Sequence, residues 1–290
     1  MNQNPDYNVP AVDSILLPTD FSAGSLTAFY HALKAALVAK SKFTILHVSS
    51  DGEVDWTEFP GVRETLERWA LIPPGSPKSA VPQLGIDVRK AVAHGENPVK
   101  SVLRYLETHP ADLIVLATHA HEGRASWLRQ SVAEPIARKA KQMTLFIPEA
   151  VNGFVSPTGS ISLTKILIPV AVKPRPETAL AAAARLVQRL QCQRGNFVLL
   201  HVGQAEDMPA VQYPQVPGWE WQKLTRSGDV IRGIVDAAND QAADLIVMST
   251  DGRNGFLDAL RGSHSERVLH HAHWPLLTVP EGSLAAGALT

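Results

Sequence analysis

The sequence predicts an α/β protein made of two similar domains, each with a parallel β-sheet covered by helices. Three observations carry this prediction. Short apolar runs of strand length alternate with segments whose apolar residues recur at helical spacing. The same motifs occur twice along the chain, in the same order. The length of 290 residues is enough for two domains of about 150 residues each. Strands that alternate with helices imply parallel sheets with helices on both faces.

Four motifs of the first half return in the second half, which indicates a tandem duplication. The pairs are SILLP (14–18) and KILIP (165–169), ILHV (45–48) and LLHV (199–202), DLIVLAT (112–118) and DLIVMST (244–250), and LFIPE (145–149) and LTVPE (277–281). The segment 151–163 between the copies is rich in Gly, Ser and Pro, so we expect it to be the linker. The first domain is then expected at 1–150 and the second at 164–290.

The strands and the first helix of each domain follow from apolar patterns. The strands expected in the first domain are 14–18, 43–48, 86–92, 112–117 and 144–147. Those expected in the second domain are 165–170, 196–202, 219–225, 244–249 and 275–279, with the weakest pattern at 219–225. The apolar faces of the two first helices are Leu26, Phe29, Tyr30, Leu33 and Leu37, and Leu180, Ala183, Ala184, Val187 and Leu190. Ser22 is the expected N-cap of the earlier helix.

The two halves differ in the distance between their second and fourth strands. His47 lies 65 positions before Asp112, whereas His201 lies 43 positions before Asp244. The first half therefore carries 22 additional residues, which we place within 51–82. Five prolines make a regular element unlikely across much of this segment.

Composition and charge restrict the class of protein. The net charge of −1 provides no overall field that would attract nucleic acid or an anionic membrane. Cys192 is the only cysteine, which excludes an internal disulfide and a multi-thiolate metal site, and fits a reducing compartment. The first residues lack the basic start and apolar core of a signal peptide. No run approaches the roughly 18 apolar residues of a membrane span. We therefore expect a cytoplasmic protein that binds neither nucleic acid nor membrane.

The main candidate for a functional site follows the fourth strand of the second half. In DLIVMSTDGRNGFLDALRGS, Gly252 and Gly262 lie in a loop between a buried strand and a helix that begins at Ser263. Glycines let backbone N–H groups approach phosphate oxygens without a clash from Cβ. The N-terminus of the following helix adds unpaired N–H groups and a positive dipole potential. This run therefore predicts a phosphate-binding loop.

These motifs resemble the universal stress protein family over nearly the whole chain. The most specific parts are DLIVMSTDGRNGFLDALRGSHSERVLHHA, LLPTDFS and the His-Val pair that ends each second strand. The family signature is Gly-x2-Gly-x9-Gly-(Ser/Thr) after the fourth strand, with an aspartate after the first strand. The resemblance implies two tandem Rossmann-like domains, each a five-stranded parallel sheet of order 3-2-1-4-5 with helices on both faces. It also implies association through the fifth strands and, in some members, bound ATP or AMP.

Compared with this signature, the two halves keep complementary parts of a nucleotide site. In the second half, Ser249 replaces the first glycine and Ala171 stands at the aspartate position. The first half keeps Asp20, but its three glycine positions hold Ala117, Ala120 and Gln130. The candidate nucleotide-binding residues of the second half are Pro169, Val170, Val202, Met248, Ser249, Gly252, Arg253, Gly262, Ser263, His264 and Ser265. Those of the first half, expected to bind more weakly, are Thr19, Asp20, Val48, His119 and Ser131.

Several of these residues also have simple structural interpretations. The pairs Ser131…Glu134 and Ser263…Glu266 form capping boxes, and capping alone explains both, with phosphate contact by Ser263 as the alternative. A solvated helix end is preferred to a metal site for the histidine cluster, which comprises His264, His270, His271 and His273. Local packing or hydrogen bonding is preferred to catalysis for His47 and His201. Trp219 and Trp221 are expected in the core, with a ligand pocket or an interface as the alternative.

Motifs of hydrolytic enzymes are absent from the sequence. It contains no Walker lysine loop, no HExxH and no clear general base. The resemblance therefore implies a non-enzymatic stress-response or regulatory protein with a degenerate ATP or AMP site, best kept in the second half. Mg²⁺ is expected only as the companion of ATP, and no other metal is expected.

Two functions of other classes stay open. One is slow adenine-nucleotide hydrolysis and the other is an interaction scaffold without a ligand. The expected partners are an adenine nucleotide and regulatory proteins. The resemblance also implies an internal pseudo-dimer of the two domains, with a further homodimer left open.

Overall fold

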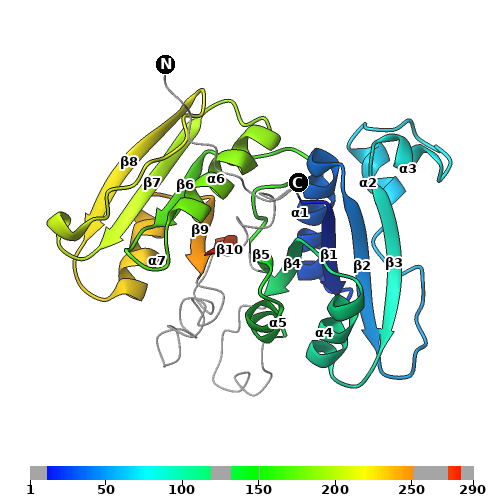
Figure 1. Ribbon diagram of the computed structural model, residues 1–290. Helices are drawn as coiled ribbons and strands as arrows, with labels where there is room; N and C mark the ends of the chain where they lie inside the picture. Colours follow the sequence, from blue (N-terminus) through cyan, green and yellow to red (C-terminus); the bar gives the residue numbers. More distant parts are fainter. Residues whose placement is uncertain (1–11, 119–131, 150, 251–273, 282–290) are drawn as a thin grey trace, which may run out of the picture. The chain divides into compact units, whose positions relative to one another are not determined.

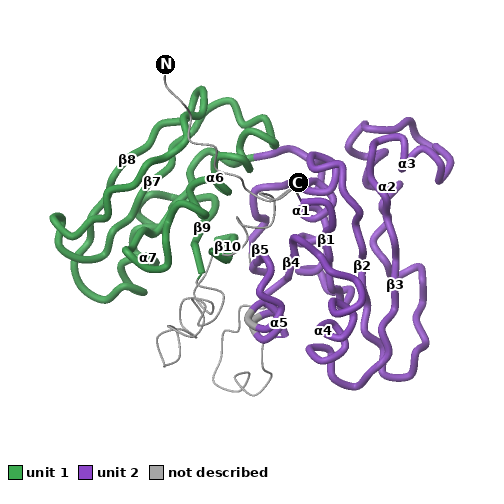
Figure 2. Tube along the Cα trace, in the orientation of Figure 1, with its two compact units in different colours: residues 1–10, 120–122, 162–290 green, residues 11–119, 123–161 purple. Residues whose placement is uncertain are grey.

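The computed structural model describes residues 12–118, 132–149, 151–250 and 274–281. These residues form two compact units, coloured separately in Figure 2. The boundary between the units lies between Ile161 and Ser162. Each unit contains one copy of the repeated motifs and its own set of five strands.

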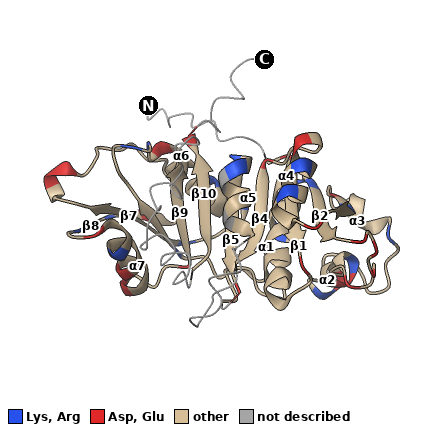
Figure 3. Ribbon diagram, turned by 90° about the horizontal axis from the view of Figure 1, so that it is seen from below, with Lys and Arg blue, Asp and Glu red and all other residues tan. Residues whose placement is uncertain are grey.

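The first unit is a parallel sheet with helices on both faces (Figure 1). Its strands are β1 (Ser14–Thr19), β2 (Lys42–Ser49), β3 (Asp87–His94), β4 (Leu113–Thr118) and β5 (Met143–Pro148). Its helices are α1 (Ala23–Ala39), α2 (Val62–Arg68), α3 (Ala80–Gln83), α4 (Pro98–Thr108) and α5 (Ala133–Ala140). The strands lie in the order β3-β2-β1-β4-β5. Helix α1 packs on β1, β4 and β5, while α4 and α5 cover the other face (Figure 3).

The second unit repeats this arrangement. Its strands are β6 (Lys165–Pro169), β7 (Gly195–Val202), β8 (Trp219–Arg226), β9 (Leu245–Thr250) and β10 (Leu276–Pro280). Its helices are α6 (Glu177–Arg189), α7 (Val230–Asp240) and the short 3₁₀ helix η1 (Ala205–Asp207). The order β8-β7-β6-β9-β10 is again 3-2-1-4-5, so the predicted topology is confirmed in both units. Strand β8 confirms the third strand, which had the weakest sequence pattern.

Helix α1 largely follows its sequence prediction. Ser22 is its N-cap, and the Ser22 hydroxyl accepts a hydrogen bond from the backbone N–H of Ser25 at 3.2 Å. Phe29 and Leu33 are buried against the sheet. Leu26, at the start of the predicted apolar face, is 42% exposed, so the face is not buried along its whole length.

In each sheet, one aspartate joins the amino-terminal ends of two strands by hydrogen bonds. Asp112, directly before β4, accepts hydrogen bonds at Oδ2 from the backbone N–H of Asp13 and from the backbone N–H and hydroxyl of Ser14, at 3.0, 2.9 and 2.8 Å. Asp244, directly before β9, accepts three equivalent bonds at 2.7–2.9 Å. Their donors are the backbone N–H and hydroxyl of Thr164 and the backbone N–H of Lys165. The aspartate of the repeated DLIV motif therefore ties the start of the first strand to the start of the fourth.

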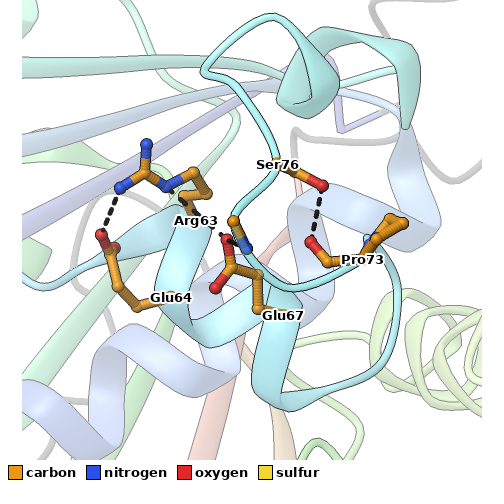
Figure 4. A network of polar contacts seen from close by, with 6 residues as sticks. Arg63, Glu64, Glu67, Pro73 and Ser76 are labelled. Carbon is orange, nitrogen blue, oxygen red and sulfur yellow. Dashed lines mark hydrogen bonds and ion pairs between the residues drawn. The ribbon is translucent and has the colours of Figure 1, made fainter.

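The proline-rich segment 51–82 is mostly irregular, as its composition predicts, but its proline-free stretch forms α2. Arg63 of α2 pairs with Glu64 at 3.0 Å and lies 3.8 Å from Glu67. Glu67 also accepts a hydrogen bond at 3.1 Å from the backbone N–H of Gly75, which holds the following loop against α2 (Figure 4). Exposed ion pairs contribute little to stability, so this network mainly positions the loop.

The aspartate contacts lead to a first prediction. Replacing Asp112 or Asp244 by Ala should lower the free energy of unfolding by roughly 2–3 kcal/mol, because each change leaves strand-end donors without a charged acceptor. The measurement is urea denaturation of the full chain. Asp236→Ala is the matched control, since Asp236 forms an exposed ion pair with Arg232 at 3.6 Å. Equal denaturation midpoints for Asp112→Ala and this control would contradict the structural role.

Candidate functional site

The predicted nucleotide-binding residues that the structure describes lie at the carboxyl ends of the central strands. In the second unit they are Pro169, Val170, Val202, Met248 and Ser249. In the first unit they are Thr19, Asp20 and Val48. The first strand of each sheet is where the strand order reverses, because its two neighbours are the second and the fourth strands. Open α/β sheets bind ligands beyond the carboxyl ends at this point.

The remaining predicted site residues lie outside the described residues, so their roles stay predictions. They are Gly252, Arg253, Gly262, Ser263, His264 and Ser265 of the second half and His119 and Ser131 of the first half. The same applies to the histidine cluster, whose other members are His270, His271 and His273.

The strand register places three candidate residues of the second unit on one face of its sheet. Pro169 pairs with Leu200, and continuing the register of β6 with β9 puts Pro169 beside Met248. Val202 lies two residues beyond Leu200 and therefore points to the same side. That side is covered by α7, because a Cβ added to Gly233 of α7 would lie 2.9 Å from Cγ2 of Val202. Pro169, Val202 and Met248 thus form an apolar group at the carboxyl edge of the sheet.

Ser249 points to the opposite face of the sheet, into the start of α6. Its hydroxyl lies 2.7 Å from that of Thr178 and accepts a hydrogen bond from the backbone N–H of Ala179 at 3.2 Å. The N-cap residue of α6, Pro176, provides no side-chain cap, so Ser249 satisfies one of the free N–H groups of this helix. The serine that stands at a glycine position of the signature is therefore engaged within the fold.

The histidine that ends each second strand bridges two strands. Nδ1 of His47 lies 2.9 Å from the carbonyl oxygen of Thr19, and Nδ1 of His201 lies 3.3 Å from that of Val170. Because a carbonyl oxygen only accepts, the proton is on Nδ1 in both rings. The prediction of local hydrogen bonding is confirmed. The ring of His47 also stacks on Phe21, with 4.2 Å between the ring centroids.

Asp20 shapes the loop between β1 and α1. Its Oδ1 accepts hydrogen bonds from the backbone N–H of Ser22 at 3.1 Å and from the hydroxyl of Ser25 at 2.6 Å. The loop of the second unit has Ala171 at this position and is held differently. There the carboxylate of Glu281, after β10, accepts a hydrogen bond from the backbone N–H of Arg175. The first loop of the candidate site is therefore held by different contacts in the two units.

Of the tryptophans of β8, Trp219 is buried and Trp221 is half-buried, which agrees with the interpretation as partly buried strand residues. The ring of Phe197 lies 4.6 Å from that of Trp219 and 4.1 Å from that of Trp221. Both indole N–H groups donate to backbone carbonyls, Trp219 to Cys192 at 2.9 Å and Trp221 to Pro214 at 3.0 Å. Burial raises the pKa of the nearby Cys192 thiol.

The described part of the chain meets neither the requirements of a metal site nor those of a membrane-spanning helix. No group of three or more His, Cys, Asp and Glu side chains is placed there to hold a metal ion. None of the helices in that part is both long enough and apolar enough to cross a membrane.

Comparison with known proteins identifies the family. The family model described as "Universal stress protein family" matches residues 11–148 and 217–280, which together exceed half of the chain. The chain belongs to the universal stress protein family. The first range covers the first repeat, and the second covers the part of the second repeat from β8 to β10.

Relatives of this universal stress protein agree with that assignment. A stretch of 46 residues is 50% identical to the universal stress protein MJ0531 of Methanocaldococcus jannaschii and spans 16% of this chain and 27% of that protein. A universal stress protein from Archaeoglobus fulgidus has a similar structure, with a TM-score of 0.60, 18% identity and coverage of 93% of this chain and 99% of that chain. A putative universal stress protein from Pseudomonas aeruginosa gives a TM-score of 0.59 at 15% identity, over 95% of this chain and 96% of that chain.

The contacts of Ser249 lead to a second prediction. Ser249→Gly restores the residue of the family signature but removes the hydroxyl that accepts a hydrogen bond from the start of α6, so it should destabilise the protein by roughly 1–2 kcal/mol. Urea denaturation measures the change. The matched control is Ala117→Gly, at the same position of the first repeat, which should cost only the roughly 0.5–1 kcal/mol of added backbone freedom. A Ser249→Gly protein as stable as the original would show that the cap contributes nothing.

Proposed function

We propose that this universal stress protein is a non-enzymatic regulatory protein whose second domain binds an adenine nucleotide, ATP or AMP. The observation that carries the proposal is the series Gly252, Gly262 and Ser263 in the loop after β9. The corresponding loop of the first domain has Ala120 and Gln130 at its last two glycine positions. Backbone N–H groups approach phosphate most closely where no Cβ intervenes, so the second domain is the better site.

The described edge of the second domain supports this assignment. The apolar group of Pro169, Val202 and Met248 offers a surface for the nucleoside, on the α7 side of the strand ends. The glycine loop and the helix that the sequence predicts from Ser263 would hold the phosphates, together with Arg253 as a counter-charge. Mg²⁺ would enter only with ATP. In the first domain the resemblance assigns weaker roles to Thr19, Asp20, Val48, His119 and Ser131.

Non-enzymatic function is part of the proposal, and the position of one described histidine supports it. Among the described residues of the second-domain edge, the histidine is His201, and its Nδ1 is bonded to the carbonyl oxygen of Val170 on the face opposite Val202. It is therefore poorly placed as a general base for a nucleotide on the α7 side. A turnover assay separates this protein from the alternative, a slow adenine-nucleotide hydrolase. A cytoplasmic location, regulatory protein partners and association of the two domains through their fifth strands also belong to the proposal.

The third prediction tests nucleotide binding. Protein purified under native conditions should release ATP or AMP detectable by mass spectrometry. Gly262→Gln should abolish this binding by placing a side chain where phosphate must approach the backbone, whereas Ser131→Ala should leave it intact. Loss of binding in Ser131→Ala with retention in Gly262→Gln would move the site to the first domain. Absence of nucleotide from the purified protein, with no binding on titration, would favour the ligand-free scaffold.

The fourth prediction concerns the missing aspartate. Ala171→Asp should tighten nucleotide binding about tenfold, since one charge-assisted hydrogen bond to the nucleoside is worth roughly 1.5–3 kcal/mol at best. The serine that engages Asp20 in the first domain, Ser25, corresponds to Pro176 in the second domain, so the new carboxylate would have no such partner within the loop. Calorimetric titration of both proteins gives the ratio of affinities. Unchanged or weaker binding would mean that the pocket has another shape.

A further inference from the structure

His31 of α1 is a buried side chain that the proposed nucleotide site does not use. It is 2% exposed, and its Nδ1 lies 2.9 Å from the carbonyl oxygen of Thr27. Its Nε2 accepts hydrogen bonds from the backbone N–H groups of Phe154 and Val155 at 3.0 and 3.1 Å. Because the carbonyl only accepts and the two N–H groups only donate, His31 is neutral with its proton on Nδ1.

The segment that His31 holds fits closely around its ring. Phe154 meets the ring edge to face, with 4.6 Å between the centroids, and both Phe154 and Val155 are buried. Gly153 has a φ of +63°, and a Cβ added there would lie 2.4 Å from Cε1 and Nε2 of His31. Any other residue at this position would be strained and would collide with the imidazole.

A second attachment comes from the inserted segment 51–82. The indole N–H of Trp69, directly after α2, donates to the carbonyl oxygen of Pro157 at 2.9 Å. Gly159 has a φ of +82°, and a Cβ added there would lie 2.7 Å from the indole ring. Val155 and Ile161 form an antiparallel bridge that closes residues 153–161, here called the strap, into a loop.

Neither attachment has a counterpart in the second repeat. The repeat places Ala182 at the position of His31, and the second half lacks the additional residues between its second and fourth strands. His31 and the inserted segment 51–82, which distinguish the first repeat from the second, therefore both contact the strap.

We propose that the inserted segment 51–82 serves as a docking platform for the strap, and that protonation of His31 releases the strap and lengthens the connection between the two domains. A protonated His31 would carry a donor on Nε2, facing two N–H donors, inside a buried site. The N–H on Nε2 of His31 would then repel the backbone N–H groups of Phe154 and Val155. Release would free nine residues, about 30 Å of extended chain.

The pH range follows from the environment of the ring. Burial lowers the pKa of His31 from 6.5 to about 4, against a smaller opposing effect of the Thr27 carbonyl. Two cations lie over aromatic rings next to this site. They are Lys34 of α1, 4.6 Å from the centroid of the Trp69 ring, and Arg68 of α2, 5.6 Å from that of Tyr30. Since the pKa is lower in the docked state, docking is fully favoured above about pH 6.5 and weakens as the pH falls towards 4.

The fifth prediction is tested by amide hydrogen exchange of the full chain, resolved to Phe154 and Val155. Their protection factors should be high at pH 7.5 and fall roughly thirtyfold at pH 5, as expected for a pKa that moves from about 4 to 6.5 on release. Amides of β1 are the internal reference and should keep their protection. Equal protection at both pH values, or low protection at both, would overturn the proposal.

Three variants sharpen this test. His31→Ala should lose protection at both amides regardless of pH, whereas His109→Ala, at an exposed histidine, should behave like the original protein. A thirtyfold fall that persists in His31→Ala would assign the pH response to another group and refute the proposal. Trp69→Phe keeps an aromatic ring but removes the N–H donor, so protection at pH 7.5 should drop roughly fivefold while the fall at pH 5 persists. Unchanged protection in Trp69→Phe would show that the inserted segment is not the platform.

Discussion

The hydrogen-bonded carboxylate before the fourth strand is the constraint on which each repeat depends. Parallel strands have no tight turn to set their register, so the pairing of the first strand with the fourth needs another restraint. Asp112 and Asp244 supply it at the amino ends, each binding the start of its first strand through one oxygen. At the carboxyl ends, His47 and His201 tie the second strand to the first. Each first strand is thus held by its two neighbours at opposite ends, and the candidate binding edge inherits its geometry from these contacts.

Register also decides which candidate residues can act together. Because side chains alternate across a sheet, adjacent residues such as Met248 and Ser249 must face different helices. Met248 joins the apolar group on the α7 side, while Ser249 caps α6. Alignment with the motif places Met248 and Ser249 in the same candidate site, whereas in the fold their side chains lie on opposite faces of the sheet. A ligand on the α7 side would meet the side chain of Met248 and not the hydroxyl of Ser249.

Much of the fold could be predicted from the sequence because its signals are local. Strands buried on both faces read as continuous apolar runs, and the duplication provides each run twice. The contacts that could not be predicted join distant positions. The donors to Asp112 lie about a hundred residues earlier in the chain, and the strap reaches a histidine 123 positions away from Phe154. Composition identifies 151–163 as a linker rich in glycine, but it could not show that Gly153 and Gly159 lie against aromatic rings. The motif in the sequence indicated where the candidate site lies. The strand register was needed to show which face of the sheet each of its residues occupies.

The duplication explains how the two halves came to differ without losing their common frame. The restraints on topology, namely the aspartate before the fourth strand and the histidine after the second, occur in both repeats. The differences lie in loops and helix surfaces that these restraints leave free to change. The first repeat has the inserted segment and His31, which bind the strap, and its loop after β4 lacks the signature glycines. The second repeat has neither feature and retains Gly252 and Gly262. Hydrogen bonds hold the first strand of each parallel sheet at both of its ends. A change in one loop therefore does not shift the strand register, and the other loops keep their positions.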